Sequence, residues 1–296
     1  MNSASIRLRR SLLYVPGDKE AMLAKAAQRG ADSVILNLED AVSDANKELA
    51  RLLVVRLLDS ANFGSADVVV RINPLTTDVG YRDLLAIVPH APGAILLPKV
   101  NTAEEVRFAA WMIERLESLY GLPAGQTKIM CMLESAAGIL AAPAIATSHP
   151  RVVALVFGAE DFSKDVNCAV TPGERTLLFA TSQLICAAHS AGVDAIDTPY
   201  MALDDDDGLA RSAQMARELG FDGKSAIHPK QVAAINVAFL PGSDQVAWAE
   251  RVIGALQADD GAEAGTAVIG GQFLDAPHLA RARRVLALAS AAHDRG

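Results

Sequence analysis

The stretch KIMCMLES, residues 128–135, shows the pattern that decides the fold. After Lys128 the run is apolar without alternation, and it ends at the acidic residue Glu134. Unbroken apolar runs are typical of parallel strands, because both faces of a parallel sheet are covered. The next run along the chain, VVALVF at 152–157, has the same character and is soon followed by Glu160-Asp161. The sequence therefore predicts buried parallel strands with acidic groups beyond their carboxyl ends.

The same pattern recurs on both sides of these two strands. The expected strands are Ser11–Val15, Ser33–Leu38, Asp67–Ile72, Ala94–Val100, Lys128–Leu133, Val152–Phe157, Val193–Asp197 and Ser225–Ile227. Stretches with helical spacing lie between them: Lys19–Arg29, Asn46–Ser60, Tyr81–Val88, Thr102–Tyr120, Ala137–Thr147, Pro172–Ala191, Asp205–Leu219 and Pro229–Phe239. Eight such βα units in about 240 residues match the size of a TIM barrel.

We therefore assign residues 1–240 to an α/β catalytic domain, a (β/α)8 TIM barrel. The main rival is a doubly wound open sheet, which normally carries fewer strands and a Gly-rich first turn. Here the first turn is Pro16-Gly17-Asp18, and no G-x-G-x-x-G is present. Residues 241–296 lie outside the barrel and are expected to form a helical extension.

The extension has the layout of a lid. Two helices, Asp244–Ala258 and Pro277–Ala292, flank a loop rich in Gly and Asp, Asp259–Gly271. The last helix carries an apolar stripe that includes Leu279 and Val285, and such a stripe needs something to pack on.

Composition excludes several classes of protein. Hydrophobic residues make up 51% and the formal net charge is −8, so a nucleic-acid or anionic-membrane partner is not expected. No run of about 18 apolar residues is present, so no membrane span is expected. The three cysteines, Cys131, Cys168 and Cys186, show no metal-type spacing. Reduced thiols of a cytoplasmic protein are their expected state.

Polar residues stand at the carboxyl ends of the expected strands. They are Glu39-Asp40, Arg71, Asn73, Lys99, Glu134-Ser135, Glu160-Asp161, Asp197-Thr198 and His228. The opposite ends carry turn residues such as Gly93 and Gly192. Because barrel active sites lie at the carboxyl ends of the strands, this asymmetry indicates an enzyme.

Glu134 and Asp161 are the candidate metal ligands. They follow neighbouring strands, which lie about 5 Å apart in a sheet, so both carboxylates can reach one ion. Two carboxylates with the other positions open to water and substrate suit Mg²⁺. No Cys/His set is spaced for zinc. The alternative is that both are rim carboxylates in salt bridges with Arg or Lys.

The remaining rim residues each have two interpretations. Glu39 and Asp40 could orient metal-bound water, Asp40 as a catalytic and Glu39 as a substrate-binding group, or they could cap a helix. Arg71 could clamp a substrate carboxylate or carbonyl, or pair with Glu39 or Asp40, and Lys99 is open to the same choice. His228 is as often a structural hydrogen-bonding residue as a catalyst. The run Asp204–Asp207 is expected to be a solvated helix N-terminus.

Several motifs together resemble those of one family. They are RSLLYVPG at 10–17, LEDAV at 38–42, VRINP at 70–74, LPKV at 97–100, LES at 133–135, FGAEDF at 157–162 and AIHP at 226–229. In number and order they resemble HpcH/HpaI-type aldolases, in the CitE-like branch with the citrate lyase β-subunit and malyl-CoA and citramalyl-CoA lyases. The resemblance runs from Arg10 to the C-terminal helix.

The resemblance implies a Mg²⁺-dependent TIM barrel that acts on acyl-CoA or acyl-carrier thioesters. It implies Glu134 and Asp161 as metal ligands and Arg71 as the clamp on the 2-oxo acid. It places Tyr14, Lys19 and Lys25 where relatives bind CoA. QFLDAP at 272–277 resembles the closing segment of the family, which implies Asp275 as an acid/base in a neighbouring subunit's site. A homotrimer or homohexamer follows from the same resemblance.

Two departures from the family pattern bear on the substrate. Asn37 stands where relatives have Asp, which removes a charge near the metal. Ala136-Ala137 replace the Thr-Ala, and often Arg, that follow the metal-binding Glu, which alters the pocket for the oxo-acid.

The expected reaction is a retro-Claisen or aldol-type cleavage. A 3-hydroxyacyl-CoA, such as malyl-CoA, citramalyl-CoA or a citryl thioester, would give acetyl-CoA or another acyl thioester and a 2-oxo acid. Three alternatives stay open: a malyl-CoA-type thioesterase, an aldolase for free hydroxy-acids, and a noncatalytic acyl-CoA-binding subunit.

Overall fold

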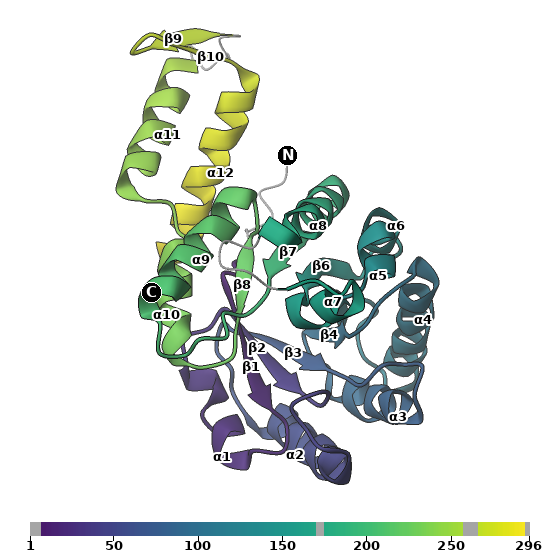
Figure 1. Cartoon of the computed structure of the whole chain (residues 1–296). Coiled ribbons are helices and arrows are strands. Elements are labelled where there is room, and N and C mark those ends of the chain that lie inside the picture. Colours follow the sequence, from purple (N-terminus) through teal and green to yellow (C-terminus); the bar gives the residue numbers. More distant parts are fainter. Residues whose placement is uncertain (1–6, 170–174, 257–265, 294–296) are drawn as a thin grey trace. The chain divides into compact units, whose positions relative to one another are not determined.

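The computed structural model describes residues 7–169, 175–256 and 266–293, and within them eight parallel strands close into a barrel (Figure 1). Each strand pairs with the one before it, and β1 also pairs with β8. The strands are β1 Ser11–Pro16, β2 Ser33–Asn37, β3 Asp67–Arg71, β4 Ala94–Leu97, β5 Lys128–Leu133, β6 Val152–Phe157, β7 Asp194–Asp197 and β8 Gly223–Ala226. The predicted (β/α)8 barrel is confirmed.

The barrel interior is packed with apolar side chains. They include Leu12, Ile35, Val69, Leu96, Met130, Met132, Val156 and Ile196, none more than 5% exposed. Burial of one large aliphatic side chain contributes roughly 1.5–3 kcal/mol. Because every strand contributes to this core or pairs with a strand that does, the core fixes the positions of the strand ends.

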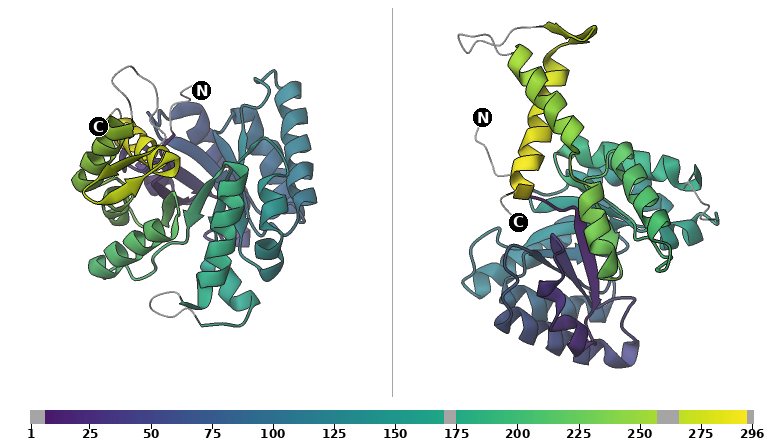
Figure 2. Two further views of the ribbon diagram at one scale, coloured as in Figure 1. Left: turned by 90° about the horizontal axis from the view of Figure 1, so that it is seen from above. Right: turned by 90° about the vertical axis from the view of Figure 1, so that its left-hand side faces the viewer.

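Helices surround the barrel (Figure 2). They are α1 Glu20–Leu23, α2 Lys47–Ser60, α3 Asp78–Ile87, α4 Ala103–Leu119, α5 Ala136–Leu140, α6 Ala142–Ala146, α7 Ala159–Asp165, α8 Leu178–Ala191, α9 Asp206–Leu219 and α10 Lys230–Ala238. Short 3-10 helices lie at Ala26–Gln28, Asp44–Asn46, Val88–His90 and Arg175–Leu177. A capping box formed by Thr102 and Glu105 begins α4.

Two segments that were each predicted to form one continuous helix are interrupted in the structure. Lys19–Arg29 is α1 followed by a 3-10 turn, and Ala137–Thr147 is divided into α5 and α6. The second division has a local cause, because Pro143 lacks the N–H that would continue the helix. The expected start of another helix at Pro172 lies outside the described residues.

The last barrel strand begins two residues earlier than expected, at Gly223. A Cβ at Gly223 would lie 1.8 Å from the carbonyl oxygen of Arg9, so only glycine allows the close approach that closes the barrel. Lys224 follows, although a charged residue argues against a buried strand. Its ammonium is fully buried and donates to Asp197 Oδ2 and to the Thr198 carbonyl oxygen, the latter at 2.8 Å.

A second compact unit begins at Phe239. It contains α11 Ser243–Leu256, β9 Ala267–Ile269, β10 Gln272–Leu274 and α12 Ala276–His293. The two strands form an antiparallel hairpin where a loop was expected, and its turn is made by Gly270 and Gly271, both with positive φ. Asn-Gly and Gly-Gly turns of this kind match the twist of paired strands. The apolar stripe of the last helix packs against α11 and the hairpin within this unit, so the stripe by itself does not indicate a neighbouring subunit.

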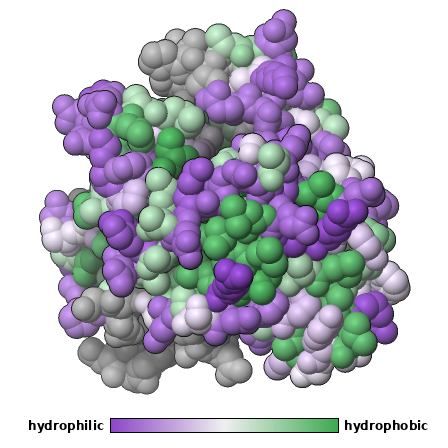
Figure 3. Space-filling view, turned by 90° about the horizontal axis from the view of Figure 1, so that it is seen from below, coloured by the Kyte–Doolittle hydropathy of each residue, from purple (hydrophilic) through white to green (hydrophobic). Residues whose placement is uncertain are grey.

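The surface retains apolar residues. Phe108 and Trp111 on α4 are about half exposed, and on the face in Figure 3 hydrophobic residues gather between hydrophilic ones. Such residues are common on soluble proteins. Within the described part of the chain, no helix combines the length and apolar character needed to cross a lipid bilayer.

We expect Lys224→Met to destabilise the barrel strongly. Methionine keeps an unbranched side chain of similar length but leaves the Asp197 carboxylate buried without its cation, which typically costs about 3–5 kcal/mol. Urea unfolding measures the change. Lys230→Met is the control, because Lys230 pairs at the surface with the exposed Asp204. Similar losses in both variants would contradict a specific role for the buried pair.

Candidate metal centre

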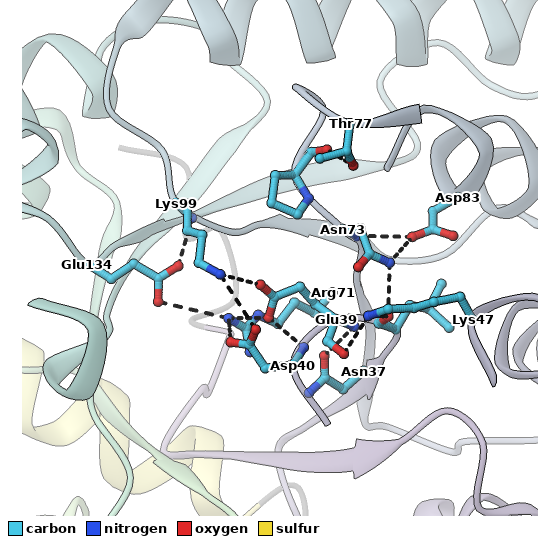
Figure 4. A network of polar contacts seen from close by, with 12 residues as sticks. Asn37, Glu39, Asp40, Lys47, Arg71, Asn73, Thr77, Asp83, Lys99 and Glu134 are labelled. Atoms are coloured by element: carbon cyan, nitrogen blue, oxygen red, sulfur yellow. Dashed lines mark hydrogen bonds and ion pairs between the residues drawn. The ribbon is translucent and has the colours of Figure 1, made fainter. Parts of the chain in front are cut away.

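Five charged side chains from four neighbouring segments meet at the carboxyl end of the barrel. Glu39 and Asp40 follow β2, Arg71 ends β3, Lys99 follows β4 and Glu134 follows β5. Their side chains point toward one another (Figure 4). A further carboxylate, Asp161, comes from the first turn of α7.

Arg71 is the centre of the cluster. Its Nη2 donates to Glu39 Oε2 at 2.8 Å and to Asp40 Oδ2 at 3.3 Å. The guanidinium is buried and lies over the ring of Tyr14, 6.0 Å from its centroid. Its Nε is also buried and has no hydrogen-bond partner among the described residues. The pairing interpretation is therefore observed.

Glu134 is a buried carboxylate held from two sides. The Lys99 backbone N–H donates to its Oε1 at 2.8 Å, and Arg71 Nη2 lies 3.9 Å from its Oε2. Gly158 lies directly against this side chain, since a Cβ at that position would be 2.6 Å from the Glu134 Cβ and Oε2. Burial raises the pKa of Glu134 to about 7 despite the opposing charge of Arg71, and the negative charge of Asp161 adds to the rise.

Asp161 is half-buried and has no ion-pair partner among the residues that the structure describes. The salt-bridge alternative therefore accounts poorly for it, and only marginally for Glu134. Two carboxylates that interact electrostatically, and that the neighbouring cations neutralise only in part, are a suitable place for a bound metal ion.

The charge of the cluster indicates the kind of ion. Four carboxylates, Glu39, Asp40, Glu134 and Asp161, and two cations, Arg71 and Lys99, give 2 − 4 = −2 when all are ionised. One divalent ion would balance this charge and keep Glu134 ionised. In the described segments no group of three or more His, Cys, Asp or Glu side chains could hold a metal. A pair of carboxylates, with the other positions left to water and substrate, would fit Mg²⁺.

Glu39 and Asp40 do not cap a helix in the structure. The next helical turn begins after Ser43, and Glu39 instead contacts Arg71 and Lys99. Burial raises the pKa of Glu39. The pKa of Asp40 is lowered, because the contacts with Glu39, Arg71 and Lys99 outweigh its own burial. Two neighbouring carboxyls with opposite shifts are a common arrangement for an acid and a base.

Among the described residues, no contact brings together the three residues that are expected to bind CoA. Tyr14 packs against the barrel core, where its hydroxyl is buried and burial raises its pKa to about 12. Lys19 and Lys25 are exposed, and the Lys19 ammonium pairs with the Asp18 carboxylate. Their role in CoA binding stays a prediction.

Three other sequence interpretations concern the rest of the chain. Asp205 caps α9 through the Gly208 N–H, as the solvated helix terminus required. His228 accepts from the Lys230 N–H at the start of α10, which is a structural contact. Asp275 lies in the second unit, where its Oδ1 is 2.6 Å from His278 Nδ1. Its acid/base role stays a prediction.

Sequence reasoning named Lys99 as a candidate but missed its backbone conformation, and it missed the contact of Gly158 with Glu134. The backbone of Lys99 has a positive φ of 53°, which no local motif announces. Gly158 had a signal, a glycine between an apolar strand and an acidic pair, which often marks a close approach.

Comparisons with known proteins agree over nearly the whole chain. A family model described as HpcH/HpaI aldolase/citrate lyase matches residues 10–229. The citrate lyase subunit beta of Leuconostoc mesenteroides subsp. cremoris is 38% identical, over 97% of this chain and 95% of that one. A (3S)-malyl-CoA thioesterase of Cereibacter sphaeroides is 35% identical, over 95% of each.

One solved structure adds ligands to the comparison. The CitE protein of Mycobacterium tuberculosis, in complex with magnesium, acetoacetate and coenzyme A, is similar with a TM-score of 0.80 and 30% identity, over 96% of this chain and all of that one. The chain is thus similar to proteins that are named for two different activities.

We expect Gly158→Ala to weaken Mg²⁺ binding by tenfold or more, because the new Cβ would displace the Glu134 side chain. Isothermal calorimetry with Mg²⁺ measures this change. Gly254→Ala is the matched control, since nothing lies within 4 Å of a Cβ there. It should bind Mg²⁺ normally and gain roughly 0.5–1 kcal/mol as a helical substitution. Normal Mg²⁺ binding by Gly158→Ala would show that Glu134 is not a ligand.

Proposed function

This chain belongs to the HpcH/HpaI aldolase/citrate lyase family, and on that premise we propose that it is a Mg²⁺-dependent carbon–carbon lyase. The proposed substrate is a 3-hydroxyacyl thioester of CoA or of an acyl carrier, such as malyl-CoA, citramalyl-CoA or a citryl thioester. The products are an acyl thioester, such as acetyl-CoA, and a 2-oxo acid. The observation that carries the proposal is the excess of two negative charges beside the buried Arg71.

The cluster can assist each change in charge along this reaction. Bound between Glu134 and Asp161, Mg²⁺ would act as a Lewis acid on the oxygen that becomes the carbonyl. Arg71 holds the carboxylate next to that carbon. Asp40, which stays ionised, takes the hydroxyl proton. The carbon–carbon bond then breaks and its electron pair forms the thioester enolate.

A proton must then reach the enolate carbon. We propose Asp275 as the acid, supplied by the second unit of a neighbouring subunit in a homotrimer or homohexamer. A positioned acid typically contributes 10²–10⁴-fold to the rate. Tyr14, Lys19 and Lys25 are the proposed contacts to CoA. The three cysteines are free thiols, which fits the cytoplasm as the proposed location.

A second candidate is a thioesterase, because one relative is named a (3S)-malyl-CoA thioesterase. Both activities begin from the same substrate, but the lyase breaks a carbon–carbon bond and the thioesterase breaks the carbon–sulfur bond. The free-acid aldolase and the noncatalytic binding subunit have no observation in their favour.

Product analysis tests the proposal. We expect malyl-CoA, citramalyl-CoA or a citryl thioester, with Mg²⁺, to give equal amounts of 2-oxo acid and acyl thioester. The oxo-acid is measured by reduction in a coupled assay, and free thiol by a disulfide reagent. Free CoA thiol with intact hydroxy-acid would assign a thioesterase instead.

We expect Glu134→Gln and Asp161→Asn each to lose Mg²⁺-dependent turnover and to fold normally. Because the folded protein raises the pKa of Glu134 to about 7, its negative charge costs stability as pH rises from about 4.5 through 7. Metal-free Glu134→Gln should therefore melt at or above the native temperature at pH 8, yet gain nothing from Mg²⁺. A variant that melts lower and is still stabilised by Mg²⁺ would contradict this role.

Subunit mixing tests the composite site. Asp275→Ala and Glu134→Gln are each expected to be inactive alone. After joint dissociation and reassembly, part of the activity should return, because some sites then combine an intact barrel with an intact Asp275. Mixed oligomers without recovery would place Asp275 in its own chain's site or outside catalysis.

A further inference from the structure

Lys99 has an unusual backbone for a long side chain. Its φ of 53° lies in the left-handed region, which among described non-glycine residues is shared only by Ala91 and Asn167. Lysine pays a conformational cost there that glycine does not, and such conformations persist where the surroundings impose them. The residue follows β4 at the edge of the metal cluster, whose contacts can impose this conformation.

The left-handed conformation directs the two ends of Lys99 to different partners. The backbone N–H donates to Glu134 Oε1 at 2.8 Å. The ammonium donates to Glu39 Oε1 at 2.8 Å and lies 3.5 Å from Asp40 Oδ1 (Figure 4). One residue thus connects the carboxyl ends of β2, β4 and β5.

A neighbouring contact holds this arrangement in place. The Lys99 carbonyl oxygen accepts from Asn101 Nδ2 at 3.1 Å. Asn101 Oδ1 in turn accepts from Ser135 Oγ, in the residue next to Glu134. The loop after β4 is therefore fastened to the loop after β5 at two points, and the backbone N–H of Lys99 has little freedom to move away from Glu134.

Glycine at this position would keep the N–H and remove the strain. What it would lack is the ammonium, so the retained side chain indicates a second task. Without Lys99 the charge of the cluster changes from 2 − 4 = −2 to 1 − 4 = −3. A more negative cluster attracts a cation more strongly and repels an anion more strongly.

We propose that Lys99 is a positioning residue with two separable tasks. Its N–H fixes the metal ligand Glu134. Its ammonium lowers the negative charge of the cluster, so that an anionic substrate binds at the expense of some Mg²⁺ affinity. The proposal rests on the proposed function for the divalent ion and the oxo-acid. The Lys99 side chain is 42% exposed, so solvent screens the charge of its ammonium and a moderate change is expected.

Loss of the ammonium charge should change the binding of a cation and of an anion in opposite directions. Lys99→Gln removes the charge and keeps the N–H. We expect Mg²⁺ alone to bind roughly three- to tenfold more tightly to this variant at low ionic strength, and oxalate to bind more weakly by a similar factor to the Mg²⁺-loaded variant. Lys99→Gly should resemble Lys99→Gln, and Lys99→Arg should restore native binding of both. Calorimetry measures each constant, and thermal unfolding confirms that each variant is folded.

One control variant and the native protein together separate this inference from the proposed function. Lys230→Gln removes a charge from another loop, where Lys230 pairs with the exposed Asp204, and should leave both constants unchanged. If the native protein binds Mg²⁺ but Lys99→Gln binds it equally or more weakly, Lys99 does not tune the charge and the inference is overturned alone. If the native protein binds no Mg²⁺, the metal site and the inference both fail.

Discussion

The burial of the Glu134 carboxylate is the constraint on which the rest of the site depends. A carboxylate that is removed from water loses its hydration, and here the protein restores only one backbone hydrogen bond and a distant guanidinium. The raised pKa of Glu134 expresses the remaining deficit. A group of this kind is stable as an anion only when a stronger positive charge is supplied, and a divalent ion is the simplest source.

The barrel makes this arrangement possible because it fixes the strand ends independently of the site. The apolar interior sets the positions of β1 to β8, and the loops only have to carry the charges. The connection extends to α7, since the Ala159 N–H donates to Thr198 Oγ1 at 3.3 Å, and the carbonyl of Thr198 accepts from the buried ammonium of Lys224. A structural ion pair outside the site therefore helps to place the helix that carries Asp161.

Much of this architecture could be predicted from sequence, for a physical reason. Buried parallel strands leave long apolar runs, and acidic residues beyond them are costly unless they are used, so the barrel and the candidates Glu134, Asp161 and Arg71 were all visible. The start of β8 was not, because Lys224 is acceptable in a buried strand only through Asp197, 27 positions away. The left-handed Lys99 was hidden likewise, since its partner Glu134 lies 35 positions further along. The Gly270-Gly271 turn was a local signal for the hairpin that the loop interpretation passed over.

The central claim is that Glu134 and Asp161 hold one divalent ion. Anomalous diffraction from crystals soaked in Mn²⁺, which takes the same oxygen ligands as Mg²⁺, tests it most directly. We expect one strong peak bonded to a carboxylate oxygen of Glu134 and one of Asp161, at roughly the 2.0–2.2 Å typical of such ions. A peak bonded to neither residue, or no peak at a saturating concentration, would contradict the account.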